Sequence, residues 1–260
     1  MNYIFDPDNW EWLVTGRNLR FILEGLAINL EIAVIAMVLS LAAGLALALL
    51  RLSRIGPVSF VAGVWVDVWR NLPLIFILLY LLLTIPSSWQ ETYADTIPSW
   101  FPEGLQSGAV LAAILGLVLY NSAVIAEIMR AGILSLDRGQ AEAARALGMS
   151  YGQTMRHVVL PQGLRRMVPA TVGQLITLNK DTTLVYILTI QEVVRHGRIV
   201  TGFNFFGGVQ APVLQVFLFI GLLFILINLA LSRLSRRLEV REARRTAGPR
   251  IRVAVEEQAA

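Results

Sequence analysis

Residues 32–50 read IAVIAMVLSLAAGLALALL, a run of apolar and small residues that contains no charged side chain. A helix needs about 20 residues to cross the hydrocarbon core of a bilayer. The run extends back to residue 22 and ends at Arg51, where the sequence RLSR begins a basic turn. This stretch therefore predicts a transmembrane helix over residues 22–50.

Four further apolar segments follow, and the composition agrees with a membrane protein. Of the 260 residues, 56% are hydrophobic and 15% are charged, which is too apolar for a soluble domain of this size. Pro73 predicts a kink in the second segment, and Lys180 and Asp181 interrupt the fourth. We expect an all-α integral membrane protein with five transmembrane helices, over about residues 22–50, 58–85, 105–129, 167–190 and 211–232.

The arginines are distributed unevenly between the two sides of the predicted membrane. Five crossings divide the connections into two sets, one with seventeen arginines and the other with only Arg17, Arg20, Arg195 and Arg198. Cytoplasmic loops are enriched in Lys and Arg. We therefore expect the N-terminus outside and the C-terminus in the cytoplasm, with a membrane domain over residues 1–234. Residues 235–260 are of mixed charge and are expected to form a partly disordered cytoplasmic tail.

Several other classes of function do not fit the residues. The isoelectric point is about 9.8, but the arginines flank apolar segments and form no recognition helix, so no nucleic-acid partner is expected. His157 and His196 are the only histidines and have no companion at metal-ligand spacing, so no metal site is predicted. The first residues carry no basic start and no cleavage signal, so we expect no cleavable signal peptide.

The longest cytoplasmic connection, residues 130–166, has the pattern of two short helices. Residues 140–147 are rich in alanine, which favours a helix, and Gly148 suits the left-handed conformation that ends one. Ser150 and Gln153 make a capping box for a second helix, which Pro161 is expected to end. An alanine-faced helix fits a shallow groove on another protein, although such a loop can equally lie on lipid headgroups.

The stretch GQAEAARALGMSYGQTMRHVVLPQ, residues 139–162, resembles the EAA loop of bacterial ABC importer permeases. Residues 70–74 (RNLPL) and 180–184 (KDTTL) resemble two further motifs of the polar amino-acid branch of that family, as does the AExxRAG run at 126–132. Two positions depart from the usual pattern, since Val158 replaces isoleucine and Asn71 replaces glycine. The run DTTLVYIL is most similar to glutamate/aspartate members.

This resemblance implies a type I ABC importer permease in the bacterial inner (cell) membrane. Its partners would be a second permease subunit, identical or related, a dimer of ATP-binding subunits and an extracytoplasmic amino-acid-binding protein. The chain has no G-x-x-x-x-G-K-[ST] loop, so we expect no catalytic residue and no cofactor here, with ATP on the partner. The residues that would couple the chain to the ATPase are Glu142, Ala143, Ala144, Gly148 and Pro161.

Polar residues in the fourth apolar segment form a candidate substrate pathway. At 100° per residue, Thr171, Gln174, Thr177, Asp181 and Thr182 fall within about 140° of arc, and Lys180 points elsewhere. Charged residues at membrane depth are costly unless they face protein or water. The alternative is a helix break at which Lys180 and Asp181 satisfy structural partners, including Glu127 or Arg130.

Two pairs of opposite charge and two external segments complete the set of candidates. Glu127 with Arg130, and Asp67 with Arg70, have the i,i+3 spacing of local ion pairs. The external segments 86–106 and 195–210 are candidates to receive the binding protein. The aromatic residues of the first segment suit either an interface or a membrane-anchoring belt, and they are Trp89, Tyr93, Trp100 and Phe101.

Three other classes of membrane protein are alternatives to the importer subunit. A secondary transporter would show an internal repeat with broken helices in matching positions, and no repeat is visible. An intramembrane enzyme would need paired catalytic groups at membrane depth, where Asp181 stands without a catalytic partner. A membrane scaffold is the remaining alternative. Co-purification of an ATPase would separate the importer from the secondary transporter and from the intramembrane enzyme.

Overall fold

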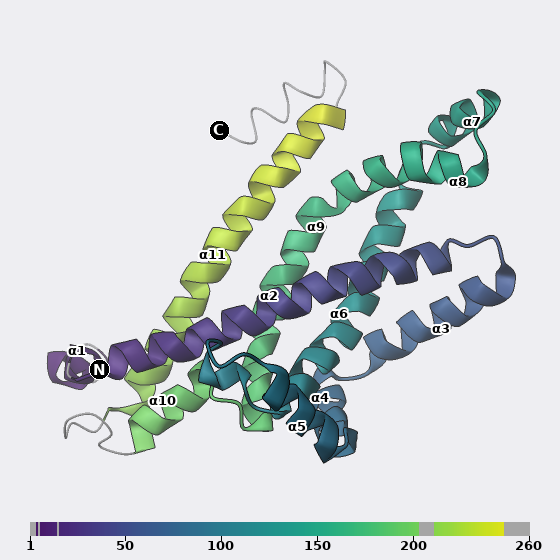
Figure 1. Cartoon of the computed structure of the whole chain (residues 1–260). Helices are drawn as coiled ribbons and strands as arrows, with labels where there is room; N and C mark the ends of the chain where they lie inside the picture. Colours follow the sequence, from purple (N-terminus) through teal and green to yellow (C-terminus); the bar gives the residue numbers. More distant parts are fainter. Residues whose placement is uncertain (1–3, 5, 15, 203–210, 247–260) are drawn as a thin grey trace. The chain divides into compact units, whose positions relative to one another are not determined.

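The computed structural model describes residues 4, 6–14, 16–202 and 211–246 (Figure 1). Every regular element within these residues is a helix, as expected. The longer helices are α2 (Asn18–Arg51), α3 (Gly56–Asn71), α6 (Ala109–Leu134), α9 (Leu160–Asp181) and α11 (Val213–Thr246). The shorter ones are η1 (Pro7–Trp10), α1 (Glu11–Val14), α4 (Leu74–Thr84), α5 (Ser87–Thr96), η2 (Glu103–Leu105), α7 (Arg138–Ala146), α8 (Tyr151–Thr154), the π-helical turn η3 (Met155–Val159), η4 (Thr182–Leu188) and α10 (Val193–Gly202).

Three of the described helices are long and apolar enough to cross a membrane, namely α2, α6 and α11. The pair α3 and α4 passes the same test as one broken span, bent by 101°. The predicted helix over residues 167–190 does not pass, because α9, the helix that contains its first part, is too polar. The expected count of five spans therefore stays a prediction.

The second apolar segment forms two helices and not the single kinked helix expected over residues 58–85. Pro73 has an extended backbone, with φ −60° and ψ 129°, and precedes the first residue of α4. A proline has no N–H to donate, and it disfavours the helical conformation in the residue before it. The expected kink at Pro73 is thus a complete break.

Pro161 does not end the second helix of the cytoplasmic loop, and that expectation is wrong. The chain passes from α8 through η3 directly into α9, in which Pro161 is the second residue. The amide of Leu160 donates to the carbonyl of Met155, five residues back. Such a π turn changes the usual hydrogen-bond register of the helix. A proline near the start of a helix lacks only an N–H that would have no partner there, so Pro161 is tolerated as the second residue of α9.

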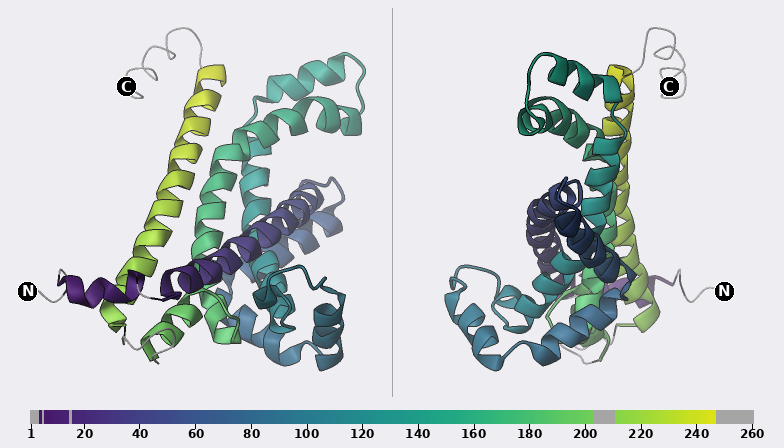
Figure 2. Two further views of the ribbon diagram at one scale, coloured as in Figure 1. Left: turned by 60° about the vertical axis from the view of Figure 1, so that its left-hand side comes forward. Right: turned by 90° about the vertical axis from the view of Figure 1, so that its right-hand side faces the viewer.

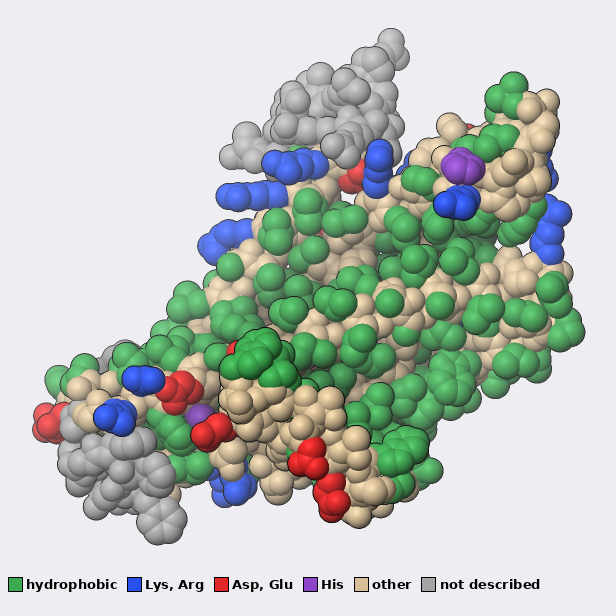
Figure 3. Space-filling model, in the orientation of Figure 1, with side chains coloured by type: hydrophobic (Ala, Val, Ile, Leu, Met, Phe, Trp, Pro, Cys, Tyr) green, Lys and Arg blue, Asp and Glu red, His purple; other side chains and the backbone are tan. Residues whose placement is uncertain are grey.

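The fourth and fifth apolar segments also differ from the expected ranges. The α-helix ends at Asp181, and a 3₁₀ turn continues to Leu188, after which Thr189 has φ 61°. Helix α11 runs past the expected end of the membrane domain at residue 234 as far as Thr246. Figure 3 shows hydrophobic side chains along the first part of α11 and basic ones on its C-terminal part. Residues 247–260 of the expected tail lie outside the described residues.

The chain divides into two compact units. The first comprises Met1–Leu39, Leu72–Tyr120 and Thr177–Asn228, and the second comprises Ser40–Asn71, Asn121–Ile176 and Leu229–Ala260. In the first unit, a hydrophobic core joins α1, the start of α2, α10 and the start of α11, with Trp12, Ile22, Val193 and Val216 fully buried. Figure 3 shows acidic side chains gathered over α5 of this unit. The second unit holds residues 130–166, the loop expected to be cytoplasmic.

Candidate functional site

Helix α7 begins and ends with local hydrogen bonds that its sequence encodes. The Asp137 side chain accepts a hydrogen bond from the amide of Gly139 at 2.8 Å, which caps the first turn. The helix starts two residues before the expected position. Ala144 is buried against the rest of the loop, whereas Glu142 and Ala143 are exposed.

Gly148 gives α7 a sharp end. Its φ of +86° lies in the left-handed region, as expected from the sequence. Its amide donates to the carbonyl of Arg145 at 2.9 Å, and the Met149 amide donates to Ala144 at 3.2 Å. These two bonds make a Schellman motif. A Cβ at this position would meet no atom within 4 Å, so glycine is required by the backbone conformation and not by space.

The second helix of the loop begins with the expected capping box. The amide of Gln153 donates to the Ser150 hydroxyl at 3.3 Å, and the Ser150 amide donates to the Gln153 side chain at 2.8 Å. Both views in Figure 2 show α7 folded back beside the following helical segment. The side-chain amide of Gln162 donates a hydrogen bond to the side-chain oxygen of Gln140 at 3.4 Å, between the two helical segments. Residues 138–162 therefore form a helical hairpin, called the coupling hairpin below.

The tip of the coupling hairpin presents a large apolar side chain to the outside. Leu147 is 84% exposed, and the neighbouring Ala143 and Ala146 are also exposed. Leu147 was not among the functional residues predicted from the sequence. The available signal was its position directly before Gly148, where the helix has ended and a leucine side chain has no core to enter. An exposed leucine between alanines is a suitable anchor for a partner protein.

The coupling hairpin and the start of α9 that follows it are fastened to two other segments of the second unit. The Tyr151 hydroxyl donates to the carbonyl of Leu52 at 3.2 Å, and the Arg54 guanidinium lies 4.1 Å from the centre of the Tyr151 ring. The Arg166 side chain donates to the carbonyl of Ser135 at 2.9 Å. Gly163 packs against Ile133 so closely that a Cβ added to Gly163 would lie 2.9 Å from the Ile133 side chain. Displacement of the hairpin would thus reach the ends of α2 and α6.

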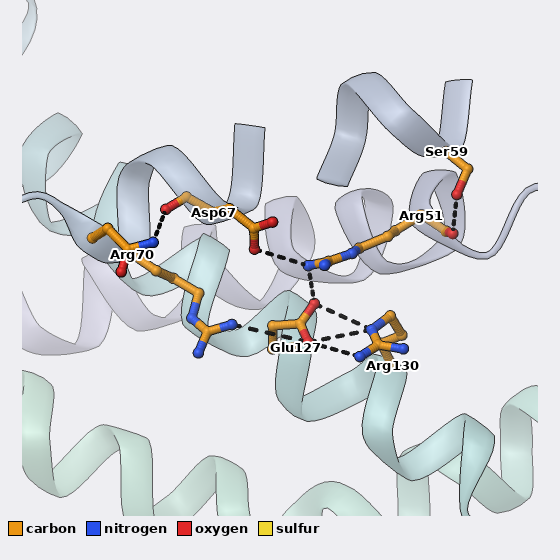
Figure 4. Close-up of polar contacts among 7 residues, drawn as sticks. Arg51, Ser59, Asp67, Arg70, Glu127 and Arg130 are labelled. Atoms are coloured by element: carbon orange, nitrogen blue, oxygen red, sulfur yellow. Dashed lines mark hydrogen bonds and ion pairs between the residues drawn. The ribbon is translucent and has the colours of Figure 1, made fainter. Parts of the chain in front are cut away.

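A five-residue ion cluster joins α2, α3 and α6 within the same unit (Figure 4). Glu127 on α6 pairs with Arg51, with Arg130 at 3.0 Å and with Arg70 at 3.9 Å. Asp67 lies 3.6 Å from Arg51. Glu127 and Arg51 are about one-fifth exposed, whereas the Asp67 side chain is 58% exposed. One carboxylate is therefore the common partner of three guanidinium groups.

The cluster confirms one expected ion pair and corrects the other. Glu127 and Arg130 form the expected i,i+3 pair. Asp67 and Arg70 do not pair with each other, because Asp67 meets Arg51 and Arg70 meets Glu127. Opposite charges at this spacing on α3 are drawn apart by stronger partners on neighbouring helices.

Two of the proposed pathway residues lie in the second unit and are held by the protein. The Gln174 side chain donates to the Asn121 side chain at 2.7 Å, and the Thr171 hydroxyl donates to the carbonyl of Met167 at 2.9 Å. Both residues are partly exposed. Gln174 therefore links α9 to α6.

The other four pathway residues, which belong to the first unit, differ among themselves. Thr182 is fully buried, and its hydroxyl donates to the carbonyl of Asn179 at 2.7 Å. Thr177 and Asp181 are partly exposed, and Lys180 is exposed. Within the described part of the chain, the Asp181 carboxylate makes no hydrogen bond or ion pair. Lys180 and Asp181 are the two charged members of this set, and Asp181 is the less exposed of them.

A buried polar network in the first unit was not predicted from the sequence. Glu192 is fully buried, and its carboxylate accepts from the amides of Val194 at 3.0 Å and Arg195 at 2.8 Å. The Asn29 amide donates to Glu192 at 3.3 Å and to the Thr182 hydroxyl at 3.2 Å. Burial raises the pKa of Glu192, and these hydrogen bonds oppose that shift. The network ties α2 to η4 and to the start of α10.

The segment 86–106, which is expected to be external, contains helices α5 and η2 and exposes its two tryptophans. Trp89 is 64% exposed and Trp100 is 78% exposed, whereas Tyr93 and Phe101 are partly buried. The other external segment, 195–210, is described only as far as residue 202. Its docking role stays a prediction.

Comparisons with known proteins agree with this arrangement. Residues 36–243 match the family model "Binding-protein-dependent transport system inner membrane component". The chain is 36% identical over 225 residues to the probable glutamine ABC transporter permease protein GlnP of Bacillus subtilis (strain 168), covering 86% of this chain and 95% of that protein. It is 33% identical over 234 residues to the glutamate/aspartate import permease protein GltK of Escherichia coli O6:H1, covering 90% and 99%.

A solved structure supports the same assignment. The structure titled "Crystal structure of an amino acid ABC transporter with histidines" superposes with a TM-score of 0.69 at 28% identity, over 86% of this chain and 94% of that one. The fold is thus that of a type I ABC importer permease, as the EAA-loop resemblance implied. The chain belongs to the family of binding-protein-dependent transport system inner membrane components, as an amino-acid ABC transporter permease.

Proposed function

We propose that this chain is the permease subunit of an importer for polar amino acids and that its coupling hairpin receives the movement of a separate ATPase. The observation that carries this proposal is the hairpin itself, which is capped at both helix ends, exposes Leu147 and contacts the end of α2. Arg166, just after the hairpin on α9, bonds the segment at the end of α6. A lipid-contacting loop would not need a Schellman end that presents one leucine at its tip. Glu142, Ala143 and Ala144 supply the helix, Gly148 ends it, and Pro161 leads into α9.

The remaining parts of the importer follow from this role. Two ATP-binding subunits bind the cofactor ATP, and a second permease, identical or related, completes the membrane path. An extracytoplasmic binding protein delivers the amino acid. The arginine distribution supports an inner-membrane subunit with its N-terminus outside and the coupling hairpin in the cytoplasm.

The ion cluster gives the hairpin a route into the membrane helices. Tyr151 of the hairpin bonds Leu52, which adjoins Arg51 of the cluster. Arg166 bonds Ser135, just beyond the end of the helix that carries Glu127. A push on the hairpin would therefore change the separation of Arg51 and Glu127. Because a partly buried charge is costly without its partner, the cluster favours discrete arrangements over gradual ones.

Glutamate or aspartate is the cargo that we propose. The support is the similarity of DTTLVYIL to glutamate/aspartate permeases and the 33% identity to GltK. Asp181 would bind the α-ammonium group, and Thr177 of the same unit would bind a carboxylate oxygen. Thr171 and Gln174, in the other unit, stay pathway residues expected from the sequence. Thr182 would hold the shape of this segment through its buried bonds, and Lys180 would attract an anionic side chain if the helix end turned it inward.

The decisive experiment uses the complete complex, purified with its ATPase and reconstituted in lipid. ATP hydrolysis is measured with the binding protein and a panel of glutamate, aspartate, glutamine, arginine and histidine. Stimulation by glutamate and aspartate above the others is the expected result. Preference for glutamine or arginine would overturn the cargo assignment but keep the importer. A cysteine at Ala143 that never crosslinks to the ATPase would overturn the coupling role.

A further inference from the structure

Glu31 is the only charged residue between Ala27 and Leu50 of α2. It lies in one of the three helices that are long and apolar enough to span a membrane. Glu31 as a whole is partly exposed. Its Oε2 atom, however, is fully buried and has no hydrogen-bond partner in the part of the chain that the structure describes. An ionisable residue in a membrane helix is costly, and it indicates a functional site. Neither the coupling hairpin nor the proposed pathway uses it.

An open cavity of about 420 Å³, nearer to a groove than to an enclosed pocket, lies directly beside Glu31, within the first unit. Its walls come from two segments, α2 and the external loop around η2. Apart from Glu31, the lining is apolar or aromatic, and includes Val34, Ile35, Trp100, Phe101 and Leu105. Small-molecule sites typically have a volume of about 300–1,000 Å³, mostly apolar walls and a few polar groups. This cavity has those proportions.

The lining determines the charge of a suitable ligand. The rings of Trp100 and Phe101 have their centroids 4.4 Å apart and are inclined by 49°. Aromatic faces attract cations through the ring quadrupole, and a carboxylate supplies a full negative charge. No Lys or Arg lines the cavity. The protein therefore provides the anionic half of an ion pair and leaves the cationic half open.

The same lining excludes a metal ion. Calcium and magnesium ions require six or more oxygen ligands, which include waters for magnesium. Here a single carboxylate faces a hydrophobic wall. An organic ammonium group suits the site better, because it can donate a hydrogen bond to one carboxylate oxygen while its alkyl part and positive charge contact the rings.

We propose that Glu31, Trp100 and Phe101 form a binding site for a primary organic ammonium group. The site is separate from Asp181 and does not depend on which amino acid is transported. The ammonium group has two available sources. One is the headgroup of phosphatidylethanolamine in the surrounding bilayer, and the other is a free amino compound on the extracytoplasmic side.

The test uses the complete transporter in nanodiscs and a hydrophobic carbodiimide, which modifies carboxyl groups in apolar surroundings. Modification of Glu31, counted as the sum of the acylurea adduct and the amide formed with a primary amine, is followed by mass spectrometry. One nanodisc contains phosphatidylcholine and phosphatidylglycerol, and a second replaces the phosphatidylcholine with phosphatidylethanolamine. A third sample has the first composition with soluble ethanolammonium chloride, and a fourth has sodium chloride at the same ionic strength.

A bound ammonium group should slow modification of Glu31 by about tenfold, which corresponds to one charge-assisted contact. Protection by phosphatidylethanolamine alone would identify the lipid as the source. Protection by ethanolammonium, with no protection by phosphatidylethanolamine, would identify a free ligand. Equal modification in all four samples would overturn the proposal, as would equal protection by sodium chloride.

Variants provide a second measurement on the same transporter. Glu31→Gln and the double variant Trp100→Leu/Phe101→Leu should each reduce the phosphatidylethanolamine or ethanolammonium retained, measured by native mass spectrometry, by about tenfold. Glu24→Gln is the matched control, because Glu24 lies on the same helix and pairs with the exposed Arg20. Retention unchanged in Glu31→Gln would overturn the proposal. If that variant fails to assemble, the carbodiimide result on the unmodified transporter decides.

Discussion

Arg51 at the end of α2 and Glu127 on α6 are 76 residues apart in the sequence and form an ion pair that two further arginines share. Both side chains are about one-fifth exposed. Breaking a partly buried pair leaves an unpaired charge, and here removal of the one carboxylate would leave three guanidinium groups close together. The pair therefore stabilises the second unit more than an exposed pair would.

The first prediction concerns Glu127. Glu127→Gln should lower the free energy of unfolding by about 1–3 kcal/mol, which is the penalty for a broken buried pair reduced for partial exposure. The measurement is thermal unfolding of the purified permease in detergent. Glu24→Gln is the control, because the Arg20–Glu24 pair is mostly exposed and should contribute little. Equal shifts in the two variants would show that the cluster is no stronger than a surface pair.

The second prediction concerns the end of α7. Gly148→Ala should strain the backbone, because alanine at φ +86° costs about 1–2 kcal/mol. We expect slower uptake with normal insertion into the membrane, since the added Cβ meets no other atom. Gly152→Ala is the matched control, with open space around its Cβ and no positive φ. Radiolabelled uptake in cells checks both, and normal uptake in Gly148→Ala would contradict the role of the sharp end.

The third prediction concerns Leu147, the exposed tip of the coupling hairpin. Burying a leucine side chain contributes about 1.5–3 kcal/mol. Leu147→Ser should therefore weaken binding of the ATPase by about tenfold or more, whereas Leu147→Met should keep it. Affinity is measured by titrating the purified ATPase onto permease in nanodiscs. Full affinity in Leu147→Ser would show that the hairpin tip does not enter the partner.

Local features of the coupling hairpin could be predicted from the sequence, whereas tertiary contacts could not. Gly148 and the Ser150–Gln153 capping box act over three or four residues, so residue type and spacing determine them. The contact between Glu127 and Arg51 depends on how three helices pack. The i,i+3 spacing of Asp67 and Arg70 indicated a local pair and could not reveal the competing partners on α2 and α6.

The predicted helix boundaries were wrong where the backbone departs from α-helical geometry. Pro161 is usually a stop signal, but the preceding π turn changes the hydrogen-bond register and admits it. The end of α9 at Asp181 gives way to a 3₁₀ turn, which places Thr182 in the buried network with Asn29. The prediction assumed a rotation of 100° per residue past Asp181, so it could not place Thr182 in the buried network.

The fourth prediction concerns pH and the contact between His196 and Phe21. The His196 ring stacks on Phe21 at 3.8 Å, and its Nδ1 lies 2.6 Å from the Phe21 carbonyl oxygen. Burial lowers the pKa of His196, although the Phe21 carbonyl opposes the shift. The unfolded chain therefore binds a proton more readily than the folded chain below about pH 6.5. Stability should fall as the pH drops from about 6.5 toward the lower folded pKa, by up to about 1.4 kcal/mol per pH unit.

Glu192 changes stability in the opposite direction and must be separated from His196. Its raised pKa means that the folded state holds a proton more readily than the unfolded state. This contribution favours folding at low pH and is lost as the pH rises from about 4.5 through the folded pKa. Thermal midpoints of the wild type, His196→Gln and the exposed control His157→Gln are compared between pH 5 and 7.5. A slope in His196→Gln that equals the wild-type slope would contradict the prediction.

The last prediction concerns Asp181 and tests whether the end of α9 contacts the cargo. Asp181 is partly exposed and makes no hydrogen bond or ion pair within the described part of the chain, so its charge is available for an amino acid's α-ammonium group. Asp181→Asn should raise the glutamate concentration for half-maximal uptake by about tenfold, while assembly and basal ATP hydrolysis remain normal. Thr182→Val is the contrasting variant, because Thr182 is fully buried and bonded to Asn179 and Asn29. Loss of that hydroxyl should lower stability without a selective effect on substrate concentration. If Asp181→Asn fails to assemble while Thr182→Val assembles normally, Asp181 is a structural residue and the cargo is bound elsewhere.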